Sequence, residues 1–203
     1  MNTKTEQEEF WAGSFGDEYV ERNRSNNLLI SKTCMFSTML RSTNNLKSVR
    51  ELGCNIGLNL VALNSLKPSL EISAYEINKK AADEASKLNI ATIYNASILD
   101  AIDQPAVDLV FTCGVLIHIN PEKLEKVYQN LFNSSKKYIL IAEYYNPSPV
   151  TINYRGHQNK LFKRDFAGEM MDKYNLKLID YGFFYHRDEL TPQDDINWFL
   201  LEK

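Results

Sequence analysis

Short apolar runs alternate with amphipathic segments along most of the chain. The runs with the length and composition of buried β-strands are residues 48–52, 71–75, 90–94, 107–113 and 138–142. Helical spacing of apolar residues separates most of them. Alternating strands and helices predict a mostly parallel sheet with helices on both faces, which is an α/β fold.

The predicted helices fill the segments between these runs. The clearest begins after Asn120, where Leu124, Val127 and Leu131 share one face and Pro121 suits the first turn. Further helices are predicted over residues 28–41, 57–65, 78–88 and 166–174, with Asn78 in an N-cap position.

Two strands with no helix between them end the chain. Residues 176–186 and 197–202 both have strand character, and a polar loop separates them. Strands joined in this way can pair antiparallel, so we expect a hairpin at one edge of the sheet. This ending distinguishes the pattern from an ordinary dinucleotide-binding fold.

The composition fits one soluble globular domain, which we expect to span residues 1–203. A net charge of −3 and a pI of about 5.7 give no electrostatic reason to expect nucleic acid or a membrane as a partner.

The three cysteines lack metal-ligand spacing, so we expect no metal site and a reducing, cytoplasmic setting. No apolar run has the length of a signal segment or a membrane span, and the oligomeric state is left open.

The segment VRELGCNIGLNL, residues 49–60, takes an apolar strand directly into a turn that opens a helix. Gly53 allows a tight turn and Gly57 a close approach of the backbone, with Cys54 and Asn55 between them. A dinucleotide site would favour the fuller G-x-G-x-x-G pattern. The Glu51 carboxylate suits the positively charged amino end of a methionine-type ligand. The alternative is a tight turn with a solvated glutamate.

An acidic residue, Glu76, ends the next predicted strand, about 20 residues after Gly53. A carboxylate at this place can accept hydrogen bonds from both hydroxyls of a ribose. The alternative is an ordinary surface carboxylate beside the start of a helix.

A polar turn, Ala96-Ser97-Ile98, closes the third predicted strand. A polar side chain there can reach the amino group of an adenine while an apolar neighbour packs on the ring. Ser97 and Ile98 fit these roles, with Ile77 on the opposite face of the ring. The alternative is a turn with no ligand.

The fourth strand ends at Thr112-Cys113-Gly114, where the sulfonium of such a cofactor should lie. A free cysteine at this place is expected to be a small buried hydrophobe and not a nucleophile. His118 follows closely and can remove a proton from an acceptor, although a core histidine explains it equally well.

These four segments resemble the motifs of class I S-adenosylmethionine (SAM)-dependent methyltransferases from about residue 45 to the C-terminus. The resemblance implies SAM as cofactor, S-adenosylhomocysteine (SAH) as product, and a Rossmann-like seven-stranded sheet of order 3-2-1-4-5-7-6. Glu76 matches the ribose acid of the family, and many members carry Asp where Ser97 stands.

The N-terminal residues 9–23, EFWAGSFGDEYVERN, resemble the opening of methyltransferases associated with pseudaminic acid biosynthesis. That resemblance implies a nine-carbon surface sugar, or its nucleotide-linked form, as the small-molecule substrate. We expect residues 1–44 to form a helical cap or lid, with Tyr19 and Arg22 near the methionine carboxylate. A helix packed on the core is the alternative.

The segment after the fifth strand carries the expected substrate residues, because ligands of open α/β sheets bind beyond the carboxyl ends of the strands. They are Tyr144, Tyr154, Arg155, His157, Lys163 and Arg164. A solvated basic loop is the alternative.

The function expected from these observations is SAM-dependent methyl transfer to an O or N atom of a small polar metabolite. Methyl transfer from a sulfonium is an in-line displacement, so the protein mainly aligns the reactants. His118, His157 and, more weakly, Tyr144 and Glu143 are the candidate bases. The alternatives are a protein or amino-acid acceptor, or a SAM-binding module without catalysis.

Overall fold

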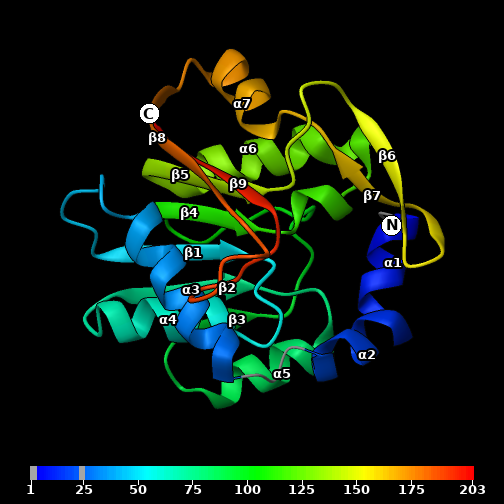
Figure 1. Ribbon diagram of the computed structural model, residues 1–203, viewed down its shortest axis with the longest axis horizontal. Coiled ribbons are helices and arrows are strands. Elements are labelled where there is room, and N and C mark those ends of the chain that lie inside the picture. The colour runs from blue at the N-terminus through cyan, green and yellow to red at the C-terminus, as the bar shows by residue number, and fades with distance from the viewer. Residues whose placement is uncertain (1–3, 23–25) are drawn as a thin grey trace.

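A seven-stranded sheet forms the centre of the computed structural model, which describes residues 4–22 and 26–203 (Figure 1). Its strands are β1 (Ser48–Leu52), β2 (Glu71–Tyr75), β3 (Thr92–Tyr94), β4 (Val107–Cys113), β5 (Ser135–Glu143), β8 (Lys177–Phe184) and β9 (Ile196–Glu202). Each apolar run predicted as a strand therefore contains one, with shifted ends at β3 and β5.

The strand order in this sheet is β3-β2-β1-β4-β5-β9-β8. Strands β1 to β5 pair in parallel, and β9 lies antiparallel between β5 and β8. The predicted order 3-2-1-4-5-7-6 is wrong as numbered, because two unpredicted strands precede the last pair. These are β6 (Val150–Tyr154) and β7 (His157–Lys163), which form a separate antiparallel hairpin where a loop was expected.

Helices cover both faces of the sheet. One face carries α3 (Asn26–Met39), α4 (Leu58–Leu66) and α5 (Lys79–Lys87), and the other carries α6 (Leu124–Ser134) and α7 (Phe166–Tyr174). In β5, Leu140 packs toward the first set and Ile139 toward the second, and both are fully buried. Burial on both faces explains the unbroken apolar run. Among the described helices, none combines the length and apolar character that crossing a bilayer requires.

Local capping sets where the helices begin. The Asn78 side chain accepts the N–H of Ala81 at 2.9 Å and starts α5, as its N-cap position predicted. The helix predicted from Pro121 begins three residues later, because Pro121–Lys123 forms a separate 3₁₀ turn, η2. There the Asn120 side chain accepts the N–H of Glu122 at 3.0 Å and tightens the first turn.

The N-terminal helices divide into two parts. Helices α1 (Glu6–Ala12) and α2 (Ser14–Arg22) lie beside the β6–β7 hairpin and border the cavity at the strand ends (Figure 1). Helix α3 packs into the core instead, where Met35, Phe36 and Met39 are at most 1% exposed. Helices α1 and α2 are called the N-terminal lid below, and α3 belongs to the helical layer.

Truncating the centre of the sheet should destabilise the protein strongly. Leu140→Ala is expected to lower the free energy of unfolding by about 2–5 kcal/mol, because it leaves a cavity in the core. Leu178→Ala is the matched control on edge strand β8, where the side chain is 38% exposed, and it should cost less than about 1 kcal/mol. Urea unfolding measures both, and equal losses would contradict this placement of the core.

Candidate functional site

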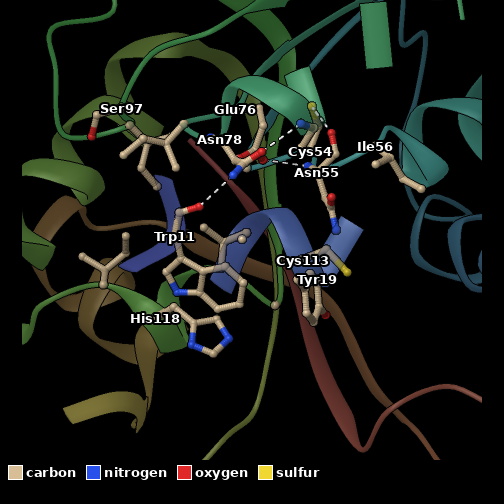
Figure 2. A pocket seen from close by; sticks show the side chains of 18 of the residues that line it. Trp11, Tyr19, Cys54, Asn55, Ile56, Glu76, Asn78, Ser97, Cys113 and His118 are labelled. Atoms are coloured by element: carbon tan, nitrogen blue, oxygen red, sulfur yellow. Dashed lines mark hydrogen bonds between the residues drawn. The ribbon is translucent and has the colours of Figure 1, made fainter. Parts of the chain in front are cut away.

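An open cavity lies where β1, β2 and β4 end, under the N-terminal lid (Figure 2). Its empty space, counting the part open to solvent, is about 1160 Å³. The predicted site residues that line it are Tyr19, Gly53, Cys54, Asn55, Glu76, Ile77, Ser97, Ile98, Cys113, Gly114 and His118. The fold therefore gathers residues from distant segments at one edge of the sheet.

The turn after β1 needs left-handed backbone at three places: φ is +89° at Gly53, +48° at Asn55 and +84° at Gly57. The N–H of Gly53 donates to the carbonyl oxygen of Tyr75 at 2.8 Å and ties the turn to β2. A Cβ atom at Gly53 would lie 2.6 Å from a methyl group of Val115. Both the backbone angle and the space therefore require glycine there.

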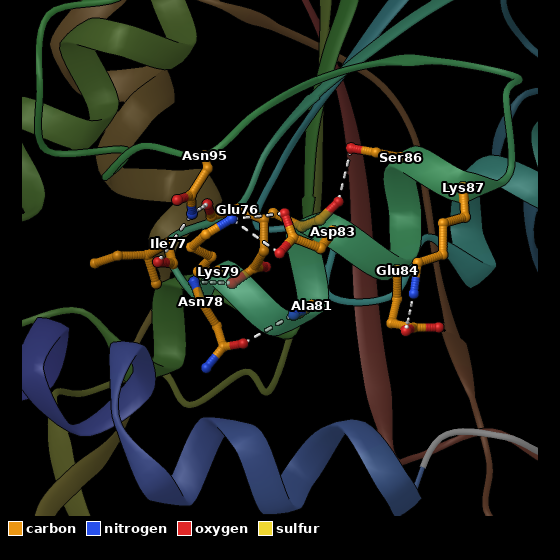
Figure 3. Close-up of polar contacts among 11 residues, drawn as sticks. Glu76, Ile77, Asn78, Lys79, Ala81, Asp83, Glu84, Ser86, Lys87 and Asn95 are labelled. Carbon is orange, nitrogen blue, oxygen red and sulfur yellow. Dashed lines mark hydrogen bonds and ion pairs between the residues drawn. The ribbon is translucent and has the colours of Figure 1, made fainter.

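The Glu76 carboxylate follows β2 and is held from two sides. Its Oε2 accepts the N–H of Asn55 at 2.7 Å (Figure 2), and its Oε1 accepts the N–H of Asn78 at 2.8 Å (Figure 3). Burial raises the pKa of Glu76, and the backbone hydrogen bonds oppose that shift. Each oxygen keeps a second lone pair for an incoming hydroxyl group.

Glu51 lies behind the cavity wall and is fully buried. Asn59 Nδ2 donates to its Oε1 at 2.5 Å, whereas Glu51 Oε2 and Asn59 Oδ1 have no hydrogen-bond partner among the described residues. Burial raises the pKa of Glu51 to about 8, and Asn59 and Lys32 oppose the shift. Asn59 and Lys32 also line the cavity. The unmet acceptor Asn59 Oδ1 and the Lys32 ammonium suit a zwitterion, whose ammonium and carboxylate they would bind.

At another part of the cavity, Ser97 contacts the N-terminal lid. Its hydroxyl donates to Glu8 Oε1 at 2.5 Å and accepts the N–H of Leu99 at 3.1 Å. Ile77 and Ile98 line the cavity as well. A carboxylate from the lid thus engages the hydroxyl that the sequence predicts near an adenine.

The cysteines of the cavity are protonated. Burial raises the pKa of Cys113 to about 12, and it also raises the pKa of Cys54. The thiolate is the nucleophilic form, so neither side chain is an effective nucleophile at neutral pH.

His118 ends the short 3₁₀ helix η1 (Leu116–His118) and faces the cavity. Its Nδ1 lies 2.6 Å from the carbonyl oxygen of Lys160. A carbonyl can only accept, so Nδ1 carries the proton and Nε2 is bare. Burial lowers the pKa of His118 to about 4, against the opposing effect of that carbonyl. At neutral pH the ring is therefore an uncharged hydrogen-bond acceptor.

Glu143 holds the helix that carries His118. Its Oε1 accepts the N–H groups of Val115 and Leu116 at 3.0 Å each, and its Oε2 accepts that of Ile117 at 3.4 Å. Burial raises the pKa of Glu143 to about 7, and these N–H groups oppose the shift. Glu143 thus positions η1 from behind the cavity wall.

Aromatic rings from the lid and the hairpin enclose His118. Ring centroids lie 4.6 Å away for Trp11 and 4.9 Å away for Tyr154, and Trp11 also packs edge-on against Tyr19 at 5.3 Å. The Trp11 carbonyl accepts the Asn78 side chain at 3.2 Å, which places its indole between Asn78 and His118 (Figure 2). The lid therefore fixes one wall of the cavity.

The hairpin places the other expected substrate residues outside the cavity lining. His157 packs against Phe10 and Phe15 of the lid, at centroid distances of 5.0 and 5.5 Å. Arg155 stacks over the ring of Tyr154 at 5.7 Å, at the exposed hairpin turn. His157 therefore packs against the lid, whereas Arg155 packs against the hairpin.

Three further predicted substrate residues are engaged with protein groups. The Nζ of Lys163 lies over the Tyr144 ring at 5.1 Å, and Arg164 forms an ion pair with Glu169 at 2.5 Å. Burial raises the pKa of Tyr144, so its phenol stays protonated at neutral pH and is a poor base.

Several residues that the sequence predicts to bind the cofactor do not line the cavity, and the side chain of one more is not described by the structure. Among the described residues, Glu51, Gly57, Ala96 and Thr112 lie outside the lining. Gly57 instead begins α4, and Thr112 is fully buried within β4. Arg22 ends α2, and its side chain falls outside the described part of the structure.

Glu8, Lys32 and Asn59 are among the lining residues that were not predicted from the sequence. Lys32 could have been singled out in the sequence, because this cation shares a helical face with the apolar residues Leu29 and Phe36. Asn59 could have been singled out as well, as an amide in the otherwise apolar start of α4. No cluster of metal-binding side chains occurs within residues 4–22 and 26–203.

No family model matches the chain, and no curated protein matches it in sequence. Solved methyltransferase structures, in contrast, superpose on nearly all of it. A magnesium protoporphyrin IX methyltransferase from Synechocystis PCC 6803, solved with bound SAM, is 12% identical, covers 100% of both chains and has a TM-score of 0.69.

Two further structures show the same likeness. A 1,6-didemethyltoxoflavin-N1-methyltransferase from Burkholderia thailandensis, solved with SAH and 1,6-didemethyltoxoflavin, is 9% identical, with 97% of this chain and 86% of that chain covered and a TM-score of 0.72. A SAM-dependent methyltransferase from Clostridium acetobutylicum ATCC 824 is 12% identical, with 93% and 97% covered and a TM-score of 0.65. The chain therefore has the Rossmann-like fold of the class I SAM-dependent methyltransferases.

The protonation of His118 gives a direct test of the site. Its imidazole should stay neutral down to about pH 4, whereas a histidine in an unfolded chain titrates near pH 6.5. The unfolded chain then binds a proton that the native state does not, so stability falls as the pH drops from about 6.5 to about 4. NMR titration of the ring protons, assigned with His118→Asn, measures this pKa. A midpoint near 6.5 would contradict the buried Nδ1–H contact.

Proposed function

We propose that the protein is a SAM-dependent methyltransferase that methylates an O or N atom of a small polar metabolite. The observation that carries the proposal is the cavity itself. It presents the Glu76 carboxylate beside the turn at Gly53 and, elsewhere on its wall, the unmet acceptor Asn59 Oδ1 together with Lys32. These polar groups fit a nucleoside with an amino-acid tail.

The ribose of the cofactor would bind Glu76. Its carboxylate is fixed by the backbone of Asn55 and Asn78, so it is aimed before any ligand arrives. Preorganisation of this kind lowers the entropic cost of binding. The two free lone pairs match two neighbouring hydroxyl groups.

The amino-acid tail would bind between Lys32 and Asn59, and Glu51 would support Asn59 from behind the cavity wall. Asn59 Oδ1 is a buried acceptor that lacks a donor in the described structure, and Asn59 Nδ2 donates to Glu51. An ammonium group supplies the missing donor, and Lys32 pairs with the carboxylate of the same ligand. Tyr19 and Cys113 also line the cavity, where the sulfur is expected.

When bound, SAM supplies an electrophilic methyl group on a sulfonium. The protein has to orient the acceptor and receive its proton. His118 Nε2 is bare at neutral pH and accepts a hydrogen bond from a hydroxyl or amine. Because the pKa of His118 is only about 4, the proton transfers as the methyl bond forms, when the acceptor becomes acidic. Trp11 and Tyr154 hold the ring and keep water away.

The proposed class of methyl acceptor rests on the N-terminal resemblance, which favours a surface-sugar precursor. The compared structures include enzymes for protoporphyrin and didemethyltoxoflavin, so this fold serves varied acceptors. Arg155 and Lys163 would meet an anionic part of the substrate that extends beyond the cavity along the hairpin.

Cofactor binding should depend on Glu76. Calorimetry should detect SAH binding to the wild-type protein, and Glu76→Gln should weaken it about 10- to 100-fold through loss of a charged acceptor. Glu71→Gln, an exposed position at the other end of β2, removes the same charge and should leave the affinity unchanged. Absence of SAH binding to the wild type would overturn the proposed function.

Methyl transfer should depend on His118. A screen with methyl-labelled SAM against nine-carbon sugars, nucleotide sugars and cell protein would identify the acceptor pool. With that acceptor, His118→Asn should lower kcat about 10²- to 10⁴-fold with little change in SAH affinity. His186→Asn is the control, because His186 is exposed and pairs with Asp195. SAH binding without transfer to any pool would indicate a non-catalytic module.

A further inference from the structure

One lid carboxylate in the cavity has no role in the site described so far. Glu8 of α1 lines the cavity and lies 2.5 Å from the Ser97 hydroxyl. Ser97 occupies the turn after β3, where the sequence predicts contact with the adenine amino group. The lid thus brings a carboxylate to that turn.

The hydrogen bonds of Ser97 show that its hydroxyl is engaged. A serine hydroxyl has one proton and two lone pairs. Its proton goes to Glu8 Oε1, and one lone pair takes the N–H of Leu99. Ser97 therefore has one acceptor site left and serves mainly to orient the carboxylate.

Glu8 is held firmly and keeps an acceptor free. Its Oε2 accepts the N–H of Thr5 at 2.7 Å and the Thr5 hydroxyl at 3.0 Å, in a capping box that starts α1. Burial raises the pKa of Glu8, but the hydrogen bonds from Ser97 and Thr5 outweigh it and the net pKa is lowered. Oε1 retains a second lone pair toward the cavity.

A neighbouring lid residue points to the same kind of ligand. Gln7 is 5% exposed, and its Nε2 donates to the carbonyl oxygen of Asn159 at 3.0 Å. Its Oε1 is therefore the free end, and it is a buried acceptor without a partner among the described residues. Gln7 lines the cavity too. Two acceptors from one helix call for a ligand with N–H donors.

Asn95 connects the turn after β3 to the segment that carries Glu76. Its side chain donates to the backbone carbonyl oxygens of Glu76 and Ile77, at 2.9 and 3.2 Å (Figure 3). A base attached to a ribose at Glu76 would extend past Ile77 toward Ser97.

We propose that Glu8 reads the adenine of the cofactor, with its carboxylate accepting a hydrogen bond from the exocyclic amino group. The inference rests on the proposed function and adds to it a specificity residue that comes from the N-terminal lid. It places the nucleobase against α1, so the lid binds cofactor as well as covering the acceptor.

The test compares SAH with S-inosylhomocysteine, in which a carbonyl oxygen replaces the amino group. The wild type should prefer SAH at least about tenfold, because the carbonyl would face the carboxylate with no proton between them. Glu8→Gln should reduce the preference to about twofold or less, since its amide can turn an N–H toward the carbonyl. Glutamine also preserves the capping box, so α1 should remain folded.

A matched control isolates the role of Glu8. Glu9→Gln removes the same charge from an exposed position of α1 and should keep the wild-type preference. An unchanged preference in Glu8→Gln would overturn the role of Glu8. A wild type that binds SAH and S-inosylhomocysteine equally overturns this inference only, whereas one that binds neither overturns the proposed function.

Discussion

The Glu76 carboxylate is the contact on which the arrangement of the cavity depends. It joins the end of β2 to the turn after β1 through Asn55, and to the start of α5 through Asn78. The Asn78 side chain then reaches the lid at Trp11 and Asp17. One buried carboxylate thus links the sheet, a helix and the lid, and backbone N–H groups compensate its burial.

Glu76 is one of three buried glutamates near the carboxyl ends of the parallel strands, with Glu51 at β1 and Glu143 at β5. Burial raises the pKa of each, and hydrogen-bond donors oppose it in each case. Glu143 is fully engaged with the backbone of η1, whereas Glu51 keeps one oxygen without a partner in the described structure. Glu143 is therefore a structural carboxylate, whereas Glu51 has an oxygen that no described group engages.

The fold was largely readable from the sequence because its strands are buried on both faces. Continuous apolar runs such as the one around Leu140 mark central parallel strands, and helical spacing marks the segments between them. The β6–β7 hairpin was missed, since β6 is mostly exposed and β7 begins with polar residues. These two strands are stabilised by pairing with each other and by packing against the lid, so their sequence of polar and apolar residues resembles that of a loop.

The sequence by itself predicted the strand-end positions of the site: Gly53 because an apolar strand runs directly into a glycine turn that opens a helix, and Glu76 because it ends the next apolar run about 20 residues later. The tertiary structure alone decided which other groups meet them. It brought Glu8 to Ser97, put Lys32 and Asn59 in the lining of the same cavity, and packed His157 against Phe10 and Phe15 of the lid. These contacts join segments far apart in the chain, and their geometry follows from packing, which local patterns do not encode.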